Sequence, residues 1–462
     1  MRALTIKEVI KSTNGEYLGN QFNKQITGIS TDSRTINKGD LFVPLTGPNF
    51  DGHDFIKRAF EKGAVATLCG KDKRSKVDNL PIKDIIFVDN PQSALLSLAA
   101  YYRRLFDIPF VAITGSVGKT TTKEMTAEIL KMRFKVLKTL GNLNNEIGLP
   151  LTIFKLEEGY QVGVVELGMS ALGEISRMAS IVRPKIAVIT NIGTAHIEKL
   201  GSKQNIARAK MEILEPLGEN DLAVLNGDCQ ELWDARKTIV PKTVFFGQER
   251  GDVKARNIKS NSTNELEFDI YGCYGEMTFK ALLPGIHNVN NALAAIAVGF
   301  EMGLTRDEIQ QGLLNLKLPK MRLQLKKSYF GADIIDDAYN ANPDSMKAAL
   351  DFLQQCSHGK KRAVILGDML ELGDLSEKAH FEIGKYAAER ADIFIAVGNY
   401  AQSFKKGALQ GHLDSRCIHT FLTVREAVGE VKKLVDDCDI ILIKASRGMK
   451  MEQITQTLVR GS

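Results

Sequence analysis

The sequence predicts an α/β protein of three domains, and this prediction rests on chain length, short apolar runs and the helical patterns between them. With 462 residues, the chain is longer than one hydrophobic core usually organises, so we expect several domains that each bury their own core. From residue 108 onward, apolar runs alternate with amphipathic segments, which is typical of parallel sheets covered by helices. We place the domains at residues 1–88, 89–317 and 318–462.

The central domain is predicted as a parallel sheet with an antiparallel extension. Its expected parallel strands are the apolar runs at residues 108–114, 162–167, 185–190 and 221–226. Alternating polar and apolar residues between 253 and 283 predict antiparallel strands that extend this sheet. The alanine-rich segment 287–303 predicts a helix that closes the domain.

The last domain repeats the central pattern, whereas the first domain is smaller and mixed. The C-terminal strands are expected at residues 332–337, 361–368, 391–398 and 439–446. The helical patterns between them predict a C-terminal Rossmann-like α/β domain. Before residue 90, short apolar pieces separated by turn-rich sequences predict a small mixed α/β N-terminal domain.

Composition and charge exclude several classes of protein. The hydrophobic fraction of 44% and the charged fraction of 25% are ordinary for a globular chain. The net charge of +6 is spread along the chain without a basic arm, so we expect no nucleic-acid partner. The start has no apolar core of signal-peptide type, and no run of about 18 apolar residues occurs anywhere, so we expect a cytoplasmic location and no membrane span. Self-contained domains are compatible with a monomer.

The six cysteines are predicted to be reduced and mostly buried thiols. No Cys-x-x-Cys pair occurs, so the spacing indicates neither a disulfide framework nor a zinc site. They are Cys69, Cys229, Cys273, Cys356, Cys417 and Cys438.

A glycine-rich loop between an expected strand and an expected helix is the strongest single signal. In such a P-loop, backbone N–H groups and the helix N-terminus wrap a triphosphate. The expected ATP-binding residues are Gly115, Ser116, Val117, Gly118, Lys119, Thr120 and Thr121. Lys119 would neutralise the β and γ phosphates, and Thr120 or Thr121 would reach Mg²⁺. The loop departs from the usual pattern, because Ile113 stands where the first glycine is expected; the alternative is a plain glycine-rich turn.

Three further residues of the central domain are candidates for a metal site. Glu166 and His196 each follow a predicted strand, at the sheet edge where ligands gather in open parallel sheets. Lys210 lies on the apolar stripe of a predicted helix, the face expected to be buried, where a charged side chain is unusual. Each residue taken alone has a plainer interpretation: a strand-end carboxylate, a loop histidine, and a lysine that reaches solvent or pairs with an acid. All three could converge on one phosphate site.

Sequence strings distributed over the whole chain resemble the Mur ligase family. They extend from TDSR near residue 31 to KASRGMKME near residue 452, so the resemblance covers all three predicted domains. The strings between these two are TGSVGKTTTKEM, GNLNNEIGLPLT, VELGMS, TNIGTAHIE, ARAKMEI, GIHNVNNALAA and DDAYNANPDSM. Within the family, the chain looks most like the members that act on D-alanyl-D-alanine.

The resemblance implies an ATP-dependent amide ligase of peptidoglycan precursor synthesis. ATP would phosphorylate the free carboxylate of UDP-N-acetylmuramoyl-tripeptide, and the amine of D-alanyl-D-alanine would attack the acyl phosphate. The family implies two Mg²⁺ sites with Glu166 and His196 as ligands, and a carbamylated Lys210 that binds the second ion. Carbamylation requires a neutral amine, so the environment of Lys210 must lower its pKa. Whether the third peptide residue is lysine or meso-diaminopimelate stays open.

The same resemblance assigns the remaining nucleotide contacts. Asn291 would contact adenine with help from His287, although Asn288 as a helix N-cap explains this cluster equally well. Asp337 would bind the ribose, and Arg322 would reach the γ-phosphate.

The resemblance also assigns residues to the two other substrates. The residues expected to bind the UDP-sugar-peptide are Thr31, Asp32, Ser33, Arg34, Asn142, Asn144, Asn145 and Glu146. The residues expected to hold the acceptor dipeptide are Asn340, Asn342, Ser446 and Arg447. The alternatives are structural: a helix cap with a salt bridge for the first group, Asx-turns for the asparagine loop, and plain turns for the acceptor group.

Two rival functions remain open at this point. A sister ligase of the same architecture could add the third peptide residue, or glutamates to folate, but the string DDAYNANPDSM favours the dipeptide. A P-loop switch or regulatory ATPase would leave the whole third domain unexplained.

Overall fold

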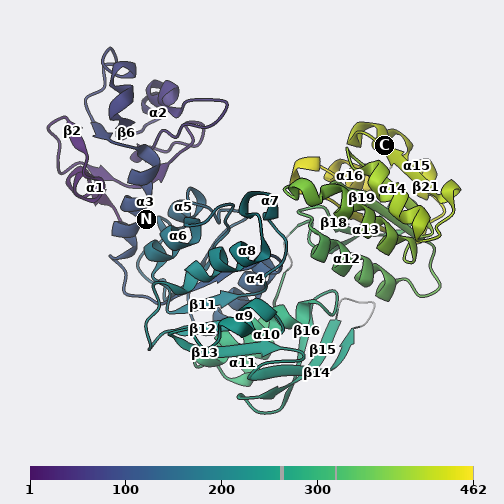
Figure 1. Ribbon diagram of the computed structural model, residues 1–462. Coiled ribbons are helices and arrows are strands. Elements are labelled where there is room, and N and C mark those ends of the chain that lie inside the picture. The colour runs from purple at the N-terminus through teal and green to yellow at the C-terminus, as the bar shows by residue number, and fades with distance from the viewer. Residues whose placement is uncertain (261–264, 318–319, 461–462) are drawn as a thin grey trace.

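The computed structural model describes residues 1–260, 265–317 and 320–460, and it confirms the α/β fold class. Each of the three domains contains its own sheet with parallel strands, and the three lie in sequence order along the chain (Figure 1). The predicted boundary after residue 317 adjoins residues 318–319, which lie outside the described residues. The exact domain bounds therefore stay predictions.

The N-terminal domain is a small mixed sheet with helices. Its main sheet has the order β2-β7-β6-β5-β4, in which β2 is antiparallel and the others are parallel, and β1 pairs with β3 separately. The strands are β1 (Leu4–Thr5), β2 (Glu16–Leu18), β3 (Gln25–Ile26), β4 (Gly28–Ser30), β5 (Asp40–Phe42), β6 (Ala66–Gly70) and β7 (Ile85–Val88). The helices are α1 (Ile6–Thr13) and α2 (Ile56–Glu61), and α3 (Pro91–Arg103) leads into the next domain.

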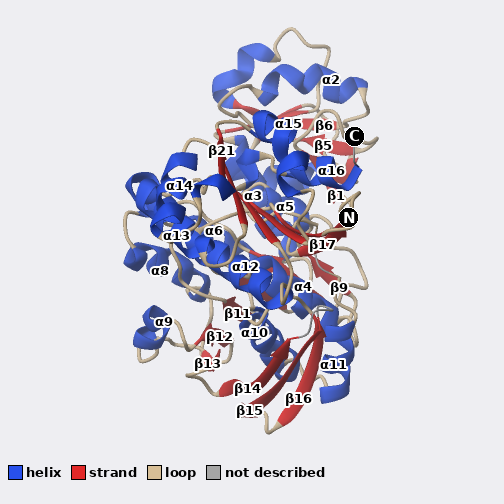
Figure 2. Cartoon of the chain, turned by 90° about the vertical axis from the view of Figure 1, so that its right-hand side faces the viewer, coloured by secondary structure: helices blue, strands red, loops and turns tan. Residues whose placement is uncertain are grey.

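The central domain has a parallel sheet that continues into antiparallel strands, as predicted. The sheet order is β16-β15-β14-β13-β12-β11-β8-β10-β9, and only the pairs β14–β15 and β15–β16 are antiparallel. Its strands are β8 (Phe110–Thr114), β9 (Val136–Lys138), β10 (Val162–Glu166), β11 (Ile186–Ile189), β12 (Leu222–Asn226), β13 (Lys242–Gly247), β14 (Val253–Ser260), β15 (Glu265–Gly272) and β16 (Met277–Leu282). Figure 2 places the antiparallel strands at the end of the molecule far from the N-terminal domain.

Helices cover both faces of the central sheet, because alternate strand residues point to opposite cores. Phe110 and Ala112 of β8 belong to one core cluster, whereas Val111 and Ile113 belong to the other. The helices are α4 (Lys119–Leu130), α5 (Gly148–Ile153), α6 (Glu174–Val182), α7 (Ile197–Leu200), α8 (Lys203–Met211), α9 (Gln230–Ala235), α10 (Asn288–Glu301) and α11 (Arg306–Leu314).

The C-terminal domain is doubly wound around a sheet of order β17-β18-β22-β19-β20-β21. Only β17 is antiparallel to its neighbour. The strands are β17 (Gln324–Lys327), β18 (Asp333–Asp337), β19 (Arg362–Gly367), β20 (Ile393–Val397), β21 (Ile418–Phe421) and β22 (Ile440–Lys444). The helices are α12 (Pro343–Cys356), α13 (Ser376–Ala388), α14 (Ala401–Gln410), α15 (Val424–Val435) and α16 (Glu452–Arg460).

The predicted strands of the central and C-terminal domains are present, and the sequence analysis missed four more there: β9, β13, β17 and β21. The strands β9 and β21 are short and lie at sheet edges, where little apolar sequence is needed. The strand β13 has a buried apolar run that the prediction overlooked. The described helices include none that is long and apolar enough to cross a membrane. The cysteines are free thiols, as predicted, but the expectation that most of them are buried is wrong, because only Cys69 and Cys438 of the six are buried.

Candidate active site

The P-loop lies between the carboxyl end of β8 and the first turn of α4, as predicted. Gly115 and Gly118 both have left-handed φ values, +151° and +84°. A Cβ atom at Gly115 would collide with the hydroxyl of Thr190, and one at Gly118 would collide with the side chain of Asn291. Glycine is therefore required at both positions, whereas Ile113 is a buried residue of β8.

Lys119 and Thr120 begin α4 with their polar atoms turned toward the loop. The Nζ of Lys119 donates to the carbonyl of Gly115 at 2.6 Å. Desolvation lowers the pKa of Lys119, the nearby Glu166 carboxylate opposes that shift, and Arg322 adds to it. Thr120 donates from its hydroxyl to Oε2 of Glu166 at 2.9 Å. The lysine assigned to phosphate and the hydroxyl assigned to metal thus begin the same helix, with Lys119 bonded to the loop and Thr120 bonded to Glu166.

Glu166 ends β10 with its side chain buried, at 2% exposure. Besides the bond from Thr120, its Oε1 accepts from the side-chain amide of Asn144 at 2.8 Å. Asn144, predicted for the sugar-peptide site, therefore lies directly against the metal candidate. A buried carboxylate beside a hydroxyl is an oxygen donor set of the kind that Mg²⁺ prefers.

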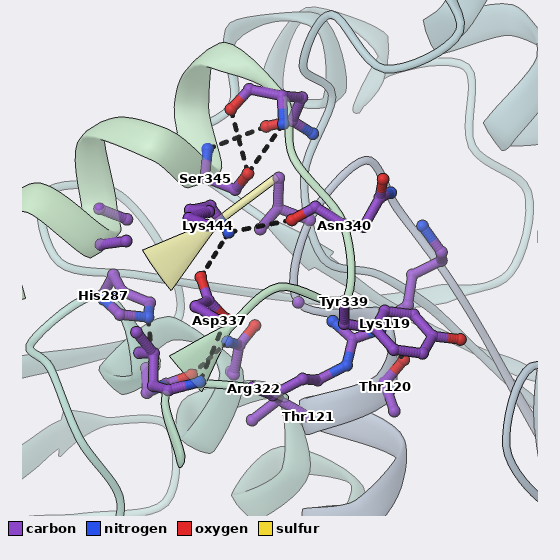
Figure 3. A pocket seen from close by; sticks show the side chains of 18 of the residues that line it. Lys119, Thr120, Thr121, His287, Arg322, Asp337, Tyr339, Asn340, Ser345 and Lys444 are labelled. Atoms are coloured by element: carbon purple, nitrogen blue, oxygen red, sulfur yellow. Dashed lines mark hydrogen bonds and ion pairs between the residues drawn. The ribbon is translucent and has the colours of Figure 1, made fainter. Parts of the chain in front are cut away.

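A pocket between the central and C-terminal domains collects most of the predicted nucleotide residues (Figure 3). The P-loop lines it from one side, the start of α10 from another, and the C-terminal domain closes it. Its predicted residues from outside the loop are His287, Asn291, Arg322, Asp337, Asn340 and Asn342. Residues that sequence reasoning missed here include Tyr339 and Lys444.

Arg322 reaches from the C-terminal domain to the P-loop. Its Nη2 donates to the hydroxyl of Thr120 at 2.9 Å, and its guanidinium lies 4.2 Å from the ring centroid of Tyr339 (Figure 3). Its Nε is buried without a hydrogen-bond partner among the described residues. An unpaired buried N–H beside a P-loop is suited to donate to an anion bound in the pocket.

Asp337 ends β18 with both carboxylate oxygens occupied. Oδ1 accepts from the backbone N–H of Leu323 at 3.1 Å, and Oδ2 forms an ion pair with Lys444. Lys444 also donates to the carbonyl of Asn340 at 3.0 Å (Figure 3). Lys444 is a buried charge at the end of the apolar strand β22, and this mismatch was the signal by which the sequence could have revealed it.

Asn291 and its neighbours form a hydrogen-bonded chain at the start of α10. The Oδ1 of Asn291 accepts from Thr122, and its Nδ2 donates to Asn288, whose own amide donates to the carbonyl of Pro284. The alternative that Asn288 caps this helix is wrong: the capping position is His287, and no side chain makes a cap bond there.

His287 provides a test of this pocket at acidic pH. Burial lowers its pKa from 6.5 to about 4. Between these values the unfolded chain binds more protons than the folded one, so this contribution to stability is complete above about pH 6.5 and is lost on acidification toward about pH 4. We expect the melting temperature of His287→Asn to fall less between about pH 7 and pH 5 than that of the parent protein. The control is His358→Asn at an exposed histidine; equal losses in His287→Asn and the parent would contradict the assignment.

Lys210 is buried on α8, at 2% exposure, as its position on the apolar stripe predicted. Its amine makes no hydrogen bond or ion pair with any residue of the described ranges, so the pairing alternative is not supported there. Desolvation lowers its pKa well below the ordinary lysine value, and repulsion from Lys119 adds to this effect. The amine of Lys210 therefore lies close enough to Lys119 for the two charges to repel each other.

His196 lies outside the pocket lining, at the start of α7. Its Nδ1 is 2.5 Å from Oε2 of Glu371, a residue of the C-terminal domain. Among the described residues, no group of three or more histidine, cysteine, aspartate or glutamate side chains gathers as a metal cluster. A metal here would therefore rely on hydroxyl, phosphate or carbamate oxygens as well as Glu166 and His196.

Comparisons with known proteins agree with this geometry. Residues 113–299 match the Mur ligase middle domain, residues 321–447 the glutamate ligase domain of Mur ligases, and residues 25–103 the Mur ligase family catalytic domain. The chain belongs to the Mur ligase family. The predicted family is thereby confirmed.

Relatives of this Mur ligase match over nearly their whole length. The UDP-N-acetylmuramoyl-tripeptide–D-alanyl-D-alanine ligase of Bacillus subtilis (strain 168) is 38% identical, and the alignment covers 98% of both chains. A crystal structure of MurF from Acinetobacter baumannii superposes with a TM-score of 0.90 at 32% identity, covering 100% of this chain and 99% of that one. The MurF ligase from Thermotoga maritima in complex with ADP gives a TM-score of 0.81 at 29% identity, covering 94% and 97%.

Residues that follow β11 hold the P-loop of this Mur ligase in shape. The side-chain oxygen of Asn191 accepts from the N–H groups of Ser116 and Val117 at 3.0 and 2.8 Å. Thr190 donates to the carbonyl of Val117, and the N–H of Gly193 donates to the hydroxyl of Ser116. The sequence analysis selected only His196 from the string TNIGTAHIE and therefore missed Asn191.

Asn191→Ala should loosen the P-loop. Losing the side-chain oxygen leaves the backbone N–H of Val117 unpaired, at a cost of about 1–3 kcal/mol, whereas Ser116 keeps the backbone carbonyl of Asn191 as an acceptor. We expect amide hydrogen exchange in the P-loop to accelerate by about 10-fold, since 1.4 kcal/mol corresponds to a factor of ten. Asn191→Asp keeps the acceptor oxygen and should retain protection, while its charge raises the KM for ATP. Unchanged exchange in Asn191→Ala would contradict this role.

The predicted UDP region divides into two parts. Thr31 and Asp32 line a hollow with Asp40 of the N-terminal domain and Leu143 of the central domain. Ser33 and Arg34 do not line it. Arg34 instead forms a bidentate salt bridge with Asp32, so the salt-bridge alternative holds, but no helix begins here.

The asparagine loop mixes structural contacts with site contacts. Asn145 accepts from the N–H groups of Ile147 and Gly148, which is the Asx-turn of the alternative interpretation. Glu146 pairs with Arg177 at 2.5 Å, and Asn142 is exposed. Of this group, only Asn144 contacts the metal candidate.

The acceptor candidates also have structural partners. Asn342 caps α12 by a reciprocal hydrogen-bond pair with Ser345. Ser446 accepts from the N–H of Leu370, and Arg447 pairs with Glu452 at 3.1 Å. Asn340 and Asn342 line the pocket, whereas Ser446 and Arg447 do not.

Proposed function

We propose that this Mur ligase joins D-alanyl-D-alanine to UDP-N-acetylmuramoyl-tripeptide at the expense of ATP, in peptidoglycan precursor synthesis. The supporting relatives carry this activity in their names, and they match along the full chain rather than one domain. The observation that carries the proposal within this structure is the pocket in which Arg322 of the C-terminal domain contacts Thr120 of the P-loop.

The chemistry follows from the charges around this pocket. A carboxylate is a poor electrophile until one of its oxygens carries a phosphoryl group, and negative charge on the γ-phosphate opposes that transfer. Backbone N–H groups of the P-loop, Lys119 and Arg322 offset this charge. The carboxylate oxygen forms a bond to the γ-phosphorus as the bond to ADP breaks. The amine of the dipeptide then attacks the acyl carbon, the amide forms, and phosphate and a proton leave.

Two Mg²⁺ ions would be held by groups of the central domain. Thr120 and Glu166 would supply oxygens for one ion beside the P-loop, with Thr121 in the same pocket. His196, Glu166 and a carbamate on Lys210 would hold the other. Bound magnesium would supply positive charge that offsets the negative charge of the phosphates.

The proposed carbamate on Lys210 is supported by the environment of its amine. The neutral amine would attack the carbon of CO₂: a C–N bond forms as one C=O π bond opens, and one proton leaves to solvent. The resulting carbamate has two oxygens that share one negative charge. Burial and repulsion from Lys119 lower the pKa of Lys210, which favours the neutral, nucleophilic amine that carbamylation needs.

The remaining assignments follow the geometry of the hollows. Thr31 and Asp32, with Asn144 toward the P-loop, support a UDP-sugar-peptide site along the N-terminal and central domains. Asn340 and Asn342 support an acceptor site at the pocket edge. A monomer in the cytoplasm fits the proposal, because ATP and UDP-linked precursors are cytoplasmic substrates.

Phosphate release tests this function directly. The purified protein is mixed with ATP, Mg²⁺ and UDP-N-acetylmuramoyl-tripeptide, with and without D-alanyl-D-alanine. We expect release only with both substrates, together with an equal amount of the amide product by mass spectrometry. Parallel arms with lysine or meso-diaminopimelate as the third residue identify the native tripeptide. Release that does not depend on the dipeptide would instead favour a sister ligase or a regulatory ATPase.

A further inference from the structure

A short segment of the central domain is docked into the C-terminal domain. Ile197, the first residue of α7, packs against a hydrophobic core of each of these domains. The N–H of Glu198 donates to the carbonyl of Glu371 at 3.4 Å, and Gly373 lies against Glu198. The loop after β19 and the segment that begins at His196 therefore form a contact between the domains.

The two residues at the centre of this contact have unusual backbones. His196 and Glu371 have φ values of +64° and +65°, in the left-handed region that non-glycine residues rarely adopt. Such a conformation persists only where surrounding contacts enforce it, and residues that adopt it are common at functional sites. Here the two strained residues face each other, with Nδ1 of the histidine 2.5 Å from the carboxylate.

The two ring nitrogens of His196 have different surroundings. Nδ1 is buried and lies 2.5 Å from Oε2 of Glu371, an ion-pair contact whose angle is outside hydrogen-bond geometry among the described residues. Nε2 makes no hydrogen bond or ion pair within the described parts of the chain. A carboxylate that accepts from one imidazole nitrogen fixes the proton there and leaves the other nitrogen as a lone-pair donor, which is how metal-binding histidines are oriented.

We propose that Glu371 is the positioning residue of His196: it holds the proton on Nδ1 and presents Nε2 to the nucleotide-bound metal. This inference rests on the proposed function for the identity of the metal site. Because Glu371 belongs to the C-terminal domain, the histidine acquires this orientation only when the two domains are docked. Metal binding in the central domain is thereby tied to the position of the domain that supplies Arg322.

The backbone at Glu371 determines which variants are informative. Glu371→Gly removes the carboxylate and accepts a φ of +65° without strain, so the loop can keep its shape. Glu371→Gln keeps an oxygen that can accept from Nδ1. Asp374→Ala is the matched control, since Asp374 is an exposed acid in the same loop.

The first measurement is the tautomer of His196 without metal or substrate. The chain has seven histidines, and His196→Gln identifies the relevant signal in long-range ¹H–¹⁵N spectra of histidine-labelled protein. We expect the Nδ1–H tautomer in the parent, Glu371→Gln and Asp374→Ala, and loss of this preference in Glu371→Gly. A parent histidine with its proton on Nε2, or a tautomer unaffected in Glu371→Gly, would overturn the proposal.

The second measurement is Mn²⁺ affinity in the presence of a non-hydrolysable ATP analogue, by electron paramagnetic resonance. We expect about 10- to 100-fold weaker binding in Glu371→Gly, with Glu371→Gln closer to the parent and Asp374→Ala unchanged. Equal affinity in Glu371→Gly and Asp374→Ala would overturn the link to the metal. The tautomer is measured without substrate, so it stays interpretable even if the protein shows no ligase activity. Failure of the positioning proposal can therefore be distinguished from failure of the proposed function.

Discussion

Lys119→Ala should reduce ligation by at least about 10³-fold in kcat/KM for ATP, because it removes the side-chain cation nearest the transferred phosphoryl group. The amine lies over its own P-loop, where it donates to the carbonyl of Gly115. Transfer of the γ-phosphoryl group depends almost entirely on such charge compensation, so other contacts cannot replace it. Steady-state phosphate release with all substrates present measures the loss.

Lys131→Ala is the matched control for this prediction. Lys131 follows the last turn of the same helix, where it is exposed and pairs with Glu128. It should leave kcat/KM within about a factor of two, since exposed ion pairs contribute little. If Lys119→Ala retained a tenth or more of the parent activity while folding normally, the catalytic assignment of the P-loop lysine would be wrong.

Lys210→Ala should lower ligation by at least about 100-fold, because it removes the proposed carbamate ligand of the second metal. The structure gives this residue no partner among the described residues, although it is buried and its pKa is strongly lowered. A small carboxylate such as acetate should restore part of the activity, since it can place two oxygens in the space left by the side chain. Depleting CO₂ should slow the parent enzyme and leave Lys210→Ala unaffected.

Lys203→Ala separates this effect from a general effect on α8. Lys203 starts the same helix, is largely exposed and pairs with Glu231 at 2.7 Å. It should show near-parent activity and no response to acetate. Absence of a mass increase of one CO₂ on native Lys210, together with no rescue by carboxylates, would reject the carbamate.

Local sequence was sufficient to predict several parts of the site. The P-loop was predictable because its glycines, lysine and threonines are consecutive and their strand and helix flank them directly. The burial of Lys210 was predictable because helical periodicity places it on the apolar stripe. The location of Glu166 followed from the end of an apolar strand.

Other parts depended on contacts between distant segments. Asn191 accepts a hydrogen bond from the P-loop, and Lys444 pairs with Asp337, each from a different strand end. No local sequence motif marks either residue. Glu371 meets His196 only because two domains dock. The helix cap formed by Asn342 and the salt bridge of Arg34 show the converse: residues singled out for substrates also serve local structure.

The sequence by itself determined the fold class, the family and the residues of the P-loop, because these depend on periodicity and on short strings that fold locally. Only the tertiary structure decided which groups share a pocket, which oxygen or nitrogen of each side chain is already engaged, and where the domains touch. The physical reason is distance in the chain: Arg322 and Thr120 are separated by 202 positions, yet they form one hydrogen bond, and only packing of whole domains determines such a pair.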